Sequence, residues 1–167
     1  MSDVLSFAEQ RRRETRAKAA LIGIDEAYIS LLVESFYDRI RADRVLGPIF
    51  DRVITGSWDS HLARMKDFWA SVALSAGSYS GQPVPVHQRL SDVTPDHFER
   101  WLQLFAETLN ETAPHPDVPD YFMLRAQRIA ESLKLSMFGV PELKTRELKT
   151  RELKTGELKA RGVPATS

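Results

Sequence analysis

Two of the four histidines in this 167-residue chain stand where an imidazole could bind a metal ion. His61 lies in the segment WDSHLARMKDFW, on a stripe of apolar residues that recur every three or four positions. His87 lies in the segment PVPVHQRL, shortly after two closely spaced prolines. A neutral imidazole is a common metal ligand in proteins. The sequence therefore raises the hypothesis of a metal site that uses at least one of these side chains.

A flat apolar cofactor with a central metal would need the residue types found near these histidines. One imidazole would bind the metal, aromatic and methionine side chains would cover the ring, and a few polar hydrogens would face the open coordination position. Tyr37 and Trp101 are candidates for the polar hydrogens. Each of these residues taken singly is also typical of a helical core, so spacing alone leaves both interpretations open.

The elements that must position these side chains have the period of helices. Asp25, Ser57 and Thr94 are typical N-cap residues, and Gly77 and Gly139 are typical of helix C-termini. No alternating segment is long enough to indicate a sheet, so the sequence predicts an all-α fold. The four long helices are predicted at about residues 25–42, 57–77, 94–109 and 119–139.

Two segments between these helices are irregular. The stretch LGPIF holds Gly47 and Pro48, and we expect it to be a connector that turns Ile49 and Phe50 inward to seal a cavity or the edge of the core. The stretch from residue 77 to residue 91 contains glycines and prolines that forbid a long helix, although one or two turns can form with prolines in the first turn. His87 would then lie on a short, rigid element.

The two ends of the chain differ in charge from its middle. Residues 1–18 carry five basic and three acidic side chains, and residues 140–167 carry seven basic and four acidic ones. The remaining residues, 19–139, have a net charge of −5. We expect a basic, partly helical extension at 1–18, one globular domain at 19–139 and a tail at 140–167. The tail repeats ELKTR with a period of five, which gives no continuous apolar face, so it is predicted to be disordered or transiently helical.

Composition excludes several kinds of site. The chain has no cysteine, so it has no disulfides, thiolate nucleophiles or thiolate-bound metal clusters, and any metal would have nitrogen or oxygen ligands. The acidic middle of the chain is a poor binder of nucleic acid. No apolar run approaches the roughly 20 residues of a membrane span, and the N-terminus has no hydrophobic leader, so we expect a cytoplasmic protein.

The order of several segments resembles the group III truncated haemoglobins of bacteria. The resemblance covers about residues 10–138 and lies in the combination of the segments, which is more specific than any one of them. These are FY at 36–37, GPIF at 47–50, HxxxMxxFW from His61, a histidine 26 residues later and RWLxLF at 100–105. The glycine pairs of other truncated haemoglobin groups are missing, which fits the third group.

The resemblance implies a truncated globin fold, with helices stacked two over two around haem b. It implies that His87 is the proximal iron ligand and that Phe50 packs on the porphyrin. His61, Tyr37 and Trp101 would form the polar distal side and are the candidate catalytic residues.

Five further residues complete the candidate cofactor contacts. Met65 would take the apolar position one helical turn after His61, and Leu90 and Phe98 would contribute to the apolar wall. Arg64 and Arg89 could pair with the haem propionates, although each could equally lie at the solvated edge of its helix.

The predicted function is binding of O₂, NO or related small ligands at a five-coordinate haem iron, with a redox role as an extension. One alternative is a peroxidase-like or NO-detoxifying enzyme, which would need an external reductase because the chain has no flavin or nicotinamide fingerprint. Another is a cofactor-free helical interaction module that docks through its tail. His61 has three open roles: a mobile gate, a sixth iron ligand or a residue that only lines the pocket entrance.

Overall fold

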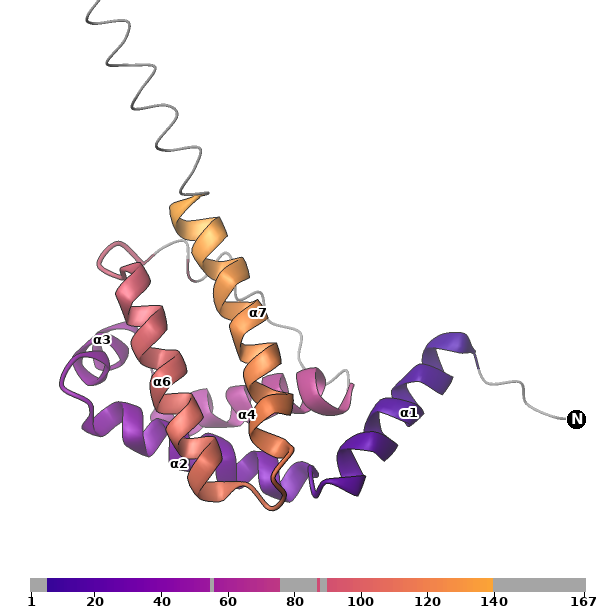
Figure 1. The fold of residues 1–167 in the computed structure, drawn as a ribbon. Coiled ribbons are helices and arrows are strands. Elements are labelled where there is room, and N and C mark those ends of the chain that lie inside the picture. The colour runs from indigo at the N-terminus through magenta and orange to yellow at the C-terminus, as the bar shows by residue number, and fades with distance from the viewer. Residues whose placement is uncertain (1–5, 55, 76–86, 88–89, 140–167) are drawn as a thin grey trace, which may run out of the picture.

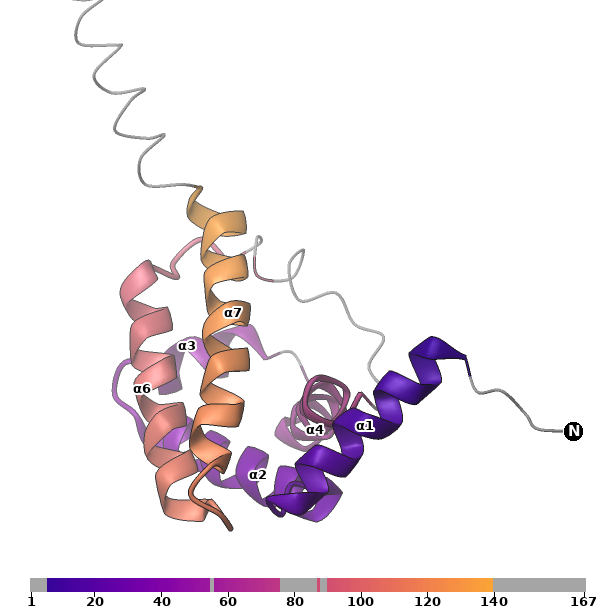
Figure 2. The ribbon, with the colours of Figure 1, turned by 45° about the vertical axis from the view of Figure 1, so that its right-hand side comes forward.

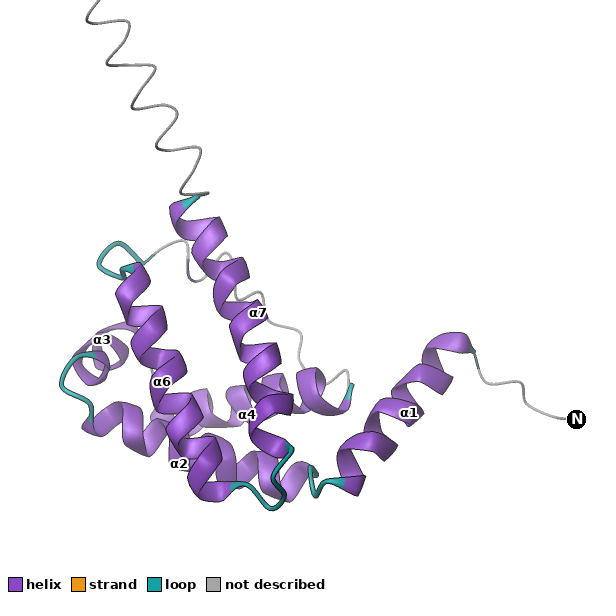
Figure 3. Ribbon diagram, in the orientation of Figure 1, coloured by secondary structure: helices purple, strands orange, loops and turns teal. Residues whose placement is uncertain are grey.

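The computed structural model of the chain describes residues 6–54, 56–75, 87 and 90–139. Within these ranges six helices are defined and no strand occurs, which confirms the predicted all-α class (Figure 3). None of the helices in these ranges is long and apolar enough to cross a membrane. The helices are α1 (Phe7–Leu21), α2 (Glu26–Ala42), α3 (Leu46–Val53), α4 (Trp58–Leu74), α6 (Pro95–Thr112) and α7 (Val118–Phe138).

The four long helices begin close to where the sequence places them, and in α2 and α4 a local side-chain cap is the reason. The Asp25 carboxylate accepts a hydrogen bond from the Tyr28 N–H at 2.8 Å, and the Ser57 hydroxyl accepts one from the Ser60 N–H at 3.1 Å. Helix α6 opens with Pro95 in its first turn, where a missing N–H costs nothing.

At the C-terminal ends of the long helices, the prediction agrees with the structure for α7 but not for α4. Helix α7 ends before Gly139, whose φ of 73° lies in the region that favours glycine. Helix α4 ends at Leu74, and Ser75 follows in the left-handed conformation with φ 53°. The terminator predicted at Gly77 lies outside the described residues.

The expectation that LGPIF is a connector is wrong, because this stretch begins helix α3. The Asp43 carboxylate accepts hydrogen bonds from the N–H groups of Val45 and Leu46, and Pro48 falls in the first turn. Gly47 is buried where a Cβ would lie 2.8 Å from the Arg41 carbonyl oxygen, so glycine lets α3 pack against the end of α2.

Two pairs of helices cross each other in a two-over-two arrangement. Helices α6 and α7 stand side by side, and α2 and α4 lie across them (Figures 1 and 2). Helix α1 extends away from these pairs and contacts α4, with Ala19 as its buried residue. It spans the boundary expected at residue 18. The tail expected at 140–167 lies outside the described residues.

Each of the four crossing helices contributes one large ring to the centre of the core. The Phe105 ring of α6 stacks on Trp69 of α4 at 4.9 Å and meets Phe36 of α2 edge-on at 5.0 Å. Phe122 of α7 closes the group at 6.4 Å from Phe105. These rings are fully buried, and aromatic pairs with such geometry add about 0.5–1.5 kcal/mol each beyond the burial of their area.

Candidate functional site

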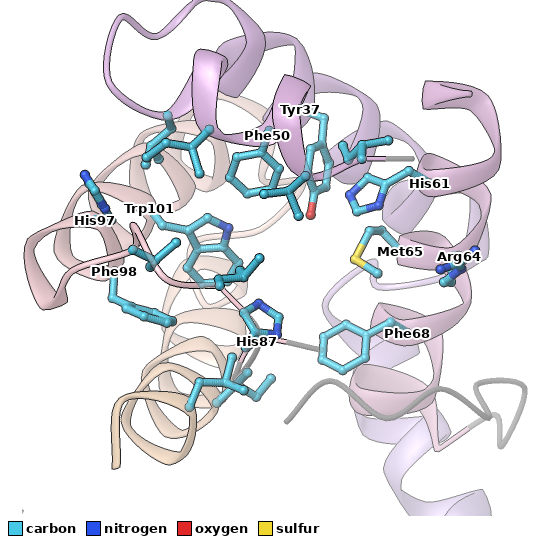
Figure 4. Close-up of a pocket in the computed structure, with 18 of the residues that line it drawn as sticks. Tyr37, Phe50, His61, Arg64, Met65, Phe68, His87, His97, Phe98 and Trp101 are labelled. Atoms are coloured by element: carbon cyan, nitrogen blue, oxygen red, sulfur yellow. The ribbon is translucent and has the colours of Figure 1, made fainter. Parts of the chain in front are cut away.

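Next to this core a pocket of about 280 Å³ opens between the helices (Figure 4). Helices α3, α4, α6 and α7 supply most of its wall, and α2 adds Tyr37. The residues outside these helices that line it are Ile54, Ser57, His87, Leu90 and Val93. Its lining is mainly apolar, which suits a flat hydrophobic ligand more than a hydrated one. The large apolar lining residues are Leu46, Ile49, Phe50, Val53, Ile54, Met65, Phe68, Trp69, Leu90, Val93, Phe98, Ile129 and Leu133.

Three polar side chains from three different helices meet at this pocket. Tyr37 comes from α2, His61 from the first turn of α4 and Trp101 from the middle of α6. The Tyr37 hydroxyl and the Trp101 indole nitrogen point into the pocket (Figure 4). Among the residues that the structure describes, neither group has a hydrogen-bond partner, so both donors are available to a ligand.

The third polar group, the imidazole of His61, is enclosed by aromatic rings. Its ring meets Tyr37 edge-on at 5.0 Å and Trp58 at 5.9 Å. The Nε2 atom of His61 is buried and has no hydrogen-bond partner among the described residues. Such an unpaired buried atom costs about 1–3 kcal/mol unless a ligand pairs with it. This nitrogen is therefore an indication that the pocket is built for a ligand.

Burial fixes the protonation state of two of these groups. It raises the pKa of the hydroxyl of Tyr37, a residue that is only 4% exposed, so this group keeps its proton and remains a donor. Burial also lowers the pKa of His61, and the nearby Arg64 guanidinium lowers it further. His61 is consequently neutral at physiological pH, with one nitrogen able to donate and the other to accept.

The two donors are held by rings that pack behind them. Trp101 stacks on Phe105 at 5.5 Å and meets Phe36 edge-on at 5.4 Å, so its indole is anchored in the core. Tyr37 contacts Phe50 at 5.9 Å. The polar ends of these side chains thus face the pocket while their apolar bodies are fixed.

His87 lies across the pocket from Tyr37 and His61 (Figure 4). Its backbone is helical, and its carbonyl accepts a hydrogen bond from the Leu90 N–H at 3.1 Å. This placement puts the His87 imidazole on one side of the pocket and Tyr37 and His61 on the other.

Every predicted site residue that the structure describes lines this one pocket. Phe50, Arg64, Met65, Leu90 and Phe98 take part in its wall together with the polar groups above. Residue 89, an arginine predicted to contact a propionate, lies outside the described residues. The structure thus brings together residues that are up to 64 positions apart in the chain, from Tyr37 to Trp101.

Sequence reasoning missed His97 and the contribution of α7. His97 lines the pocket four residues before Trp101, and this spacing could have placed both on one helix face. Its Nδ1 accepts a hydrogen bond from the Thr94 N–H at 3.0 Å, so the proton of the neutral ring is on Nε2. Ile129 and Leu133 of α7 carry no such signal, since their position depends on how α7 crosses the other helices.

Comparison with known proteins shows that the chain is similar in sequence and structure to a truncated hemoglobin. The chain is 36% identical over 118 residues to the group 3 truncated hemoglobin ctb of Campylobacter jejuni, a match that covers 69% of this chain and 92% of that protein. The crystal structure of the group III truncated hemoglobin from Campylobacter jejuni matches with a TM-score of 0.65, at 36% identity and with the same coverage. No protein-family model matches the chain.

Proposed function

Because the chain belongs to the group 3 truncated hemoglobins, we propose that it holds haem b in this pocket and binds O₂, NO or a related ligand there. Membership of this globin family implies a haem cofactor and small diatomic ligands. Beyond the family, we assign His87 as the proximal ligand and Tyr37 and Trp101 as hydrogen-bond donors to the bound ligand.

The observation that carries this assignment is the set of unsatisfied polar atoms in an otherwise apolar pocket. His61 Nε2 is buried without a partner in the described part of the chain, and the Tyr37 and Trp101 donors face the same space. A buried polar atom without a partner is costly, and the two donors beside it come from two other helices. Their arrangement fits a haem pocket with a polar distal side.

When bound, haem would supply an iron ion that His87 would ligate and at which a diatomic ligand could bind. Met65, Phe68 and Phe98 line the pocket with apolar side chains, which would exclude water from the space around the bound ligand. In such a dry site the hydroxyl of Tyr37 and the indole of Trp101 each contribute about 1–3 kcal/mol to holding a ligand that carries partial negative charge.

His61 acts next to these donors as a neutral imidazole. Its ring contacts Tyr37 and Trp58, and its unpaired Nε2 could meet a ligand in the pocket. The ferric spectrum of the ligand-free protein tests one of the three possible roles of His61. Low-spin iron with two imidazoles would identify His61 as a sixth ligand. A high-spin spectrum would leave it as a gate or a residue that lines the entrance.

The test of the proposed function is the ultraviolet–visible spectrum of the purified protein, ferric and then ferrous with CO. We expect a haem Soret band that shifts on reduction and again with CO. The His87→Ala variant should lose haem or its imidazole-ligated spectrum, and imidazole added to the buffer should restore part of it. A protein that stays colourless after haem addition would overturn the proposal, and normal spectra in the His87→Ala variant would overturn the ligand assignment.

A further inference from the structure

The carboxylate of Asp43, which lies outside the pocket, connects three helices that line the pocket. Asp43 lies between α2 and α3, and its side chain is only 5% exposed. Its Oδ1 accepts hydrogen bonds from Nε and Nη2 of Arg100 on α6, at 3.0 Å and 2.5 Å. Its Oδ2 accepts hydrogen bonds from the N–H groups of Leu46 at 2.9 Å and Val45 at 3.2 Å, at the N-terminal end of α3.

This ion pair lies close in sequence to both proposed donors without lining the pocket. Asp43 follows the end of α2, the helix that carries Tyr37, and Arg100 directly precedes Trp101 on α6. The pair therefore connects the helices of the two donors at one place. The contact of Phe36 with Phe105 between the same helices is apolar and less directional than a guanidinium on a carboxylate. Arg39 of α2 also pairs with Glu107 and Glu111, but these residues lie farther from Trp101 along α6.

A second ion pair offers a natural comparison at the other end of α3. The Nη2 atom of Arg52 lies 2.6 Å from Oδ2 of Asp92, but these side chains are 64% and 48% exposed. Exposed ion pairs contribute little because water screens them. In the first pair the Asp43 carboxylate is 5% exposed and the Arg100 guanidinium is 40% exposed, so water screens this contact less than it screens the Arg52–Asp92 pair. The first pair should therefore have the larger effect on the pocket.

We propose that Asp43 is a positioning residue for ligand binding: through Arg100 it fixes the place of Trp101 on α6 relative to Tyr37 on α2. The two donors can reach one small ligand only if their separation is held within a fraction of an ångström. Loss of the carboxylate charge lets α6 shift against α2, and the hydrogen bond from Trp101 to the ligand weakens. This role rests on the function proposed above.

The experiment uses the Asp43→Asn variant of the full chain loaded with haem. The isosteric amide keeps an oxygen for the cap of α3 but removes the charge. We expect ligand dissociation to accelerate by roughly threefold or more, the size of coupling seen within one hydrogen-bond network. The C–O stretching frequency of the CO complex should shift in the same direction as in the Trp101→Phe variant. In a Trp101→Phe background, Asp43→Asn should change neither quantity further.

The matched control is Arg52→Gln, which removes the exposed ion pair of α3 and should leave both quantities unchanged. If Asp43→Asn does not accumulate as folded protein, Arg100→Lys carries the same test, since it keeps the charge but loses the two-nitrogen contact. A lower melting temperature of Asp43→Asn with an unchanged C–O frequency would overturn the positioning role.

Failure of this inference can be told apart from failure of the proposed function. A Trp101→Phe variant that behaves as the wild type would overturn the donor role itself, and the positioning role with it. A Trp101→Phe variant that changes while Asp43→Asn does not would overturn only the role of Asp43.

Discussion

The surroundings of Tyr37 and Trp101 determine how these two side chains can act as hydrogen-bond donors in the pocket. Burial keeps the proton on the Tyr37 hydroxyl, and packing on Phe105 fixes the indole of Trp101. Both side chains thus pair an immobile apolar body with a free polar hydrogen. This combination suits a site that slows the escape of a polar ligand.

Tyr37→Phe and Trp101→Phe should each raise the O₂ dissociation rate by about tenfold, the equivalent of 1.4 kcal/mol for one lost hydrogen bond. Stopped-flow exchange of O₂ for CO measures these rates. Tyr28→Phe is a matched control, because this tyrosine of α2 pairs with Thr112 away from the pocket. Wild-type rates in both pocket variants would dismiss the donor assignment.

The pKa of Asp43 leads to a prediction of how the stability of the fold depends on pH. Hydrogen bonds from Arg100 lower the pKa of this carboxyl, with further lowering from the N–H groups of Leu46 and Val45. A pKa below the unfolded value of about 3.9 means that the charge stabilises the fold above that pH, and that this stability is lost as the pH falls through the folded pKa.

The difference in unfolding free energy between the wild type and Asp43→Asn should therefore be largest near neutral pH and shrink below about pH 4. Urea unfolding at a series of pH values measures it. A difference that stays constant down to the acid unfolding of the protein would contradict a role for the charge.

At the scale of elements, α3 determines one wall of the pocket and depends on a single close contact. Gly47 has no room for a Cβ beside the Arg41 carbonyl, and Phe50 lines the pocket one turn later. The position of Phe50 is thus linked to how closely α3 approaches the end of α2.

Gly47→Ala should destabilise the protein by about 1–3 kcal/mol, because the added methyl group must push α3 away from a backbone carbonyl. Denaturant unfolding gives this value, and Asp51→Ala at an exposed position of the same helix serves as the control. Equal stability of the two variants would show that α3 can move without cost.

At the scale of the whole molecule, Phe105 links all four crossing helices. Its ring contacts rings from α2, α4 and α7, and it also supports Trp101 from below the pocket. One residue therefore both packs the core and supports a side chain that lines the pocket.

Phe105→Ala should cost about 3–5 kcal/mol of unfolding free energy, the range for deleting a buried aromatic ring. Leu135→Ala on α7, where the side chain is 49% exposed, should cost about 0.5 kcal/mol or less. Thermal or urea unfolding of both variants checks the contrast. A small effect of Phe105→Ala would mean that the core can collapse around the missing ring.

The local features of this protein follow from its sequence. Helical periodicity and the caps Asp25 and Ser57 predict the long helices, because a hydrogen bond between residues three positions apart does not depend on distant contacts. The segment LGPIF is the exception. A capping carboxylate and the tight packing of Gly47 outweigh the general tendency of glycine and proline to interrupt helices.

Only the tertiary structure decides what these elements enclose. That Ile129 and Leu133 share a pocket with Phe50, and that Asp43 meets Arg100, depends on the angles at which helices cross. Those angles result from the fit of many side chains at once, and no short stretch of sequence encodes them. The sequence by itself determined which helices form and which residues have suitable chemistry, while packing decided which of those residues meet.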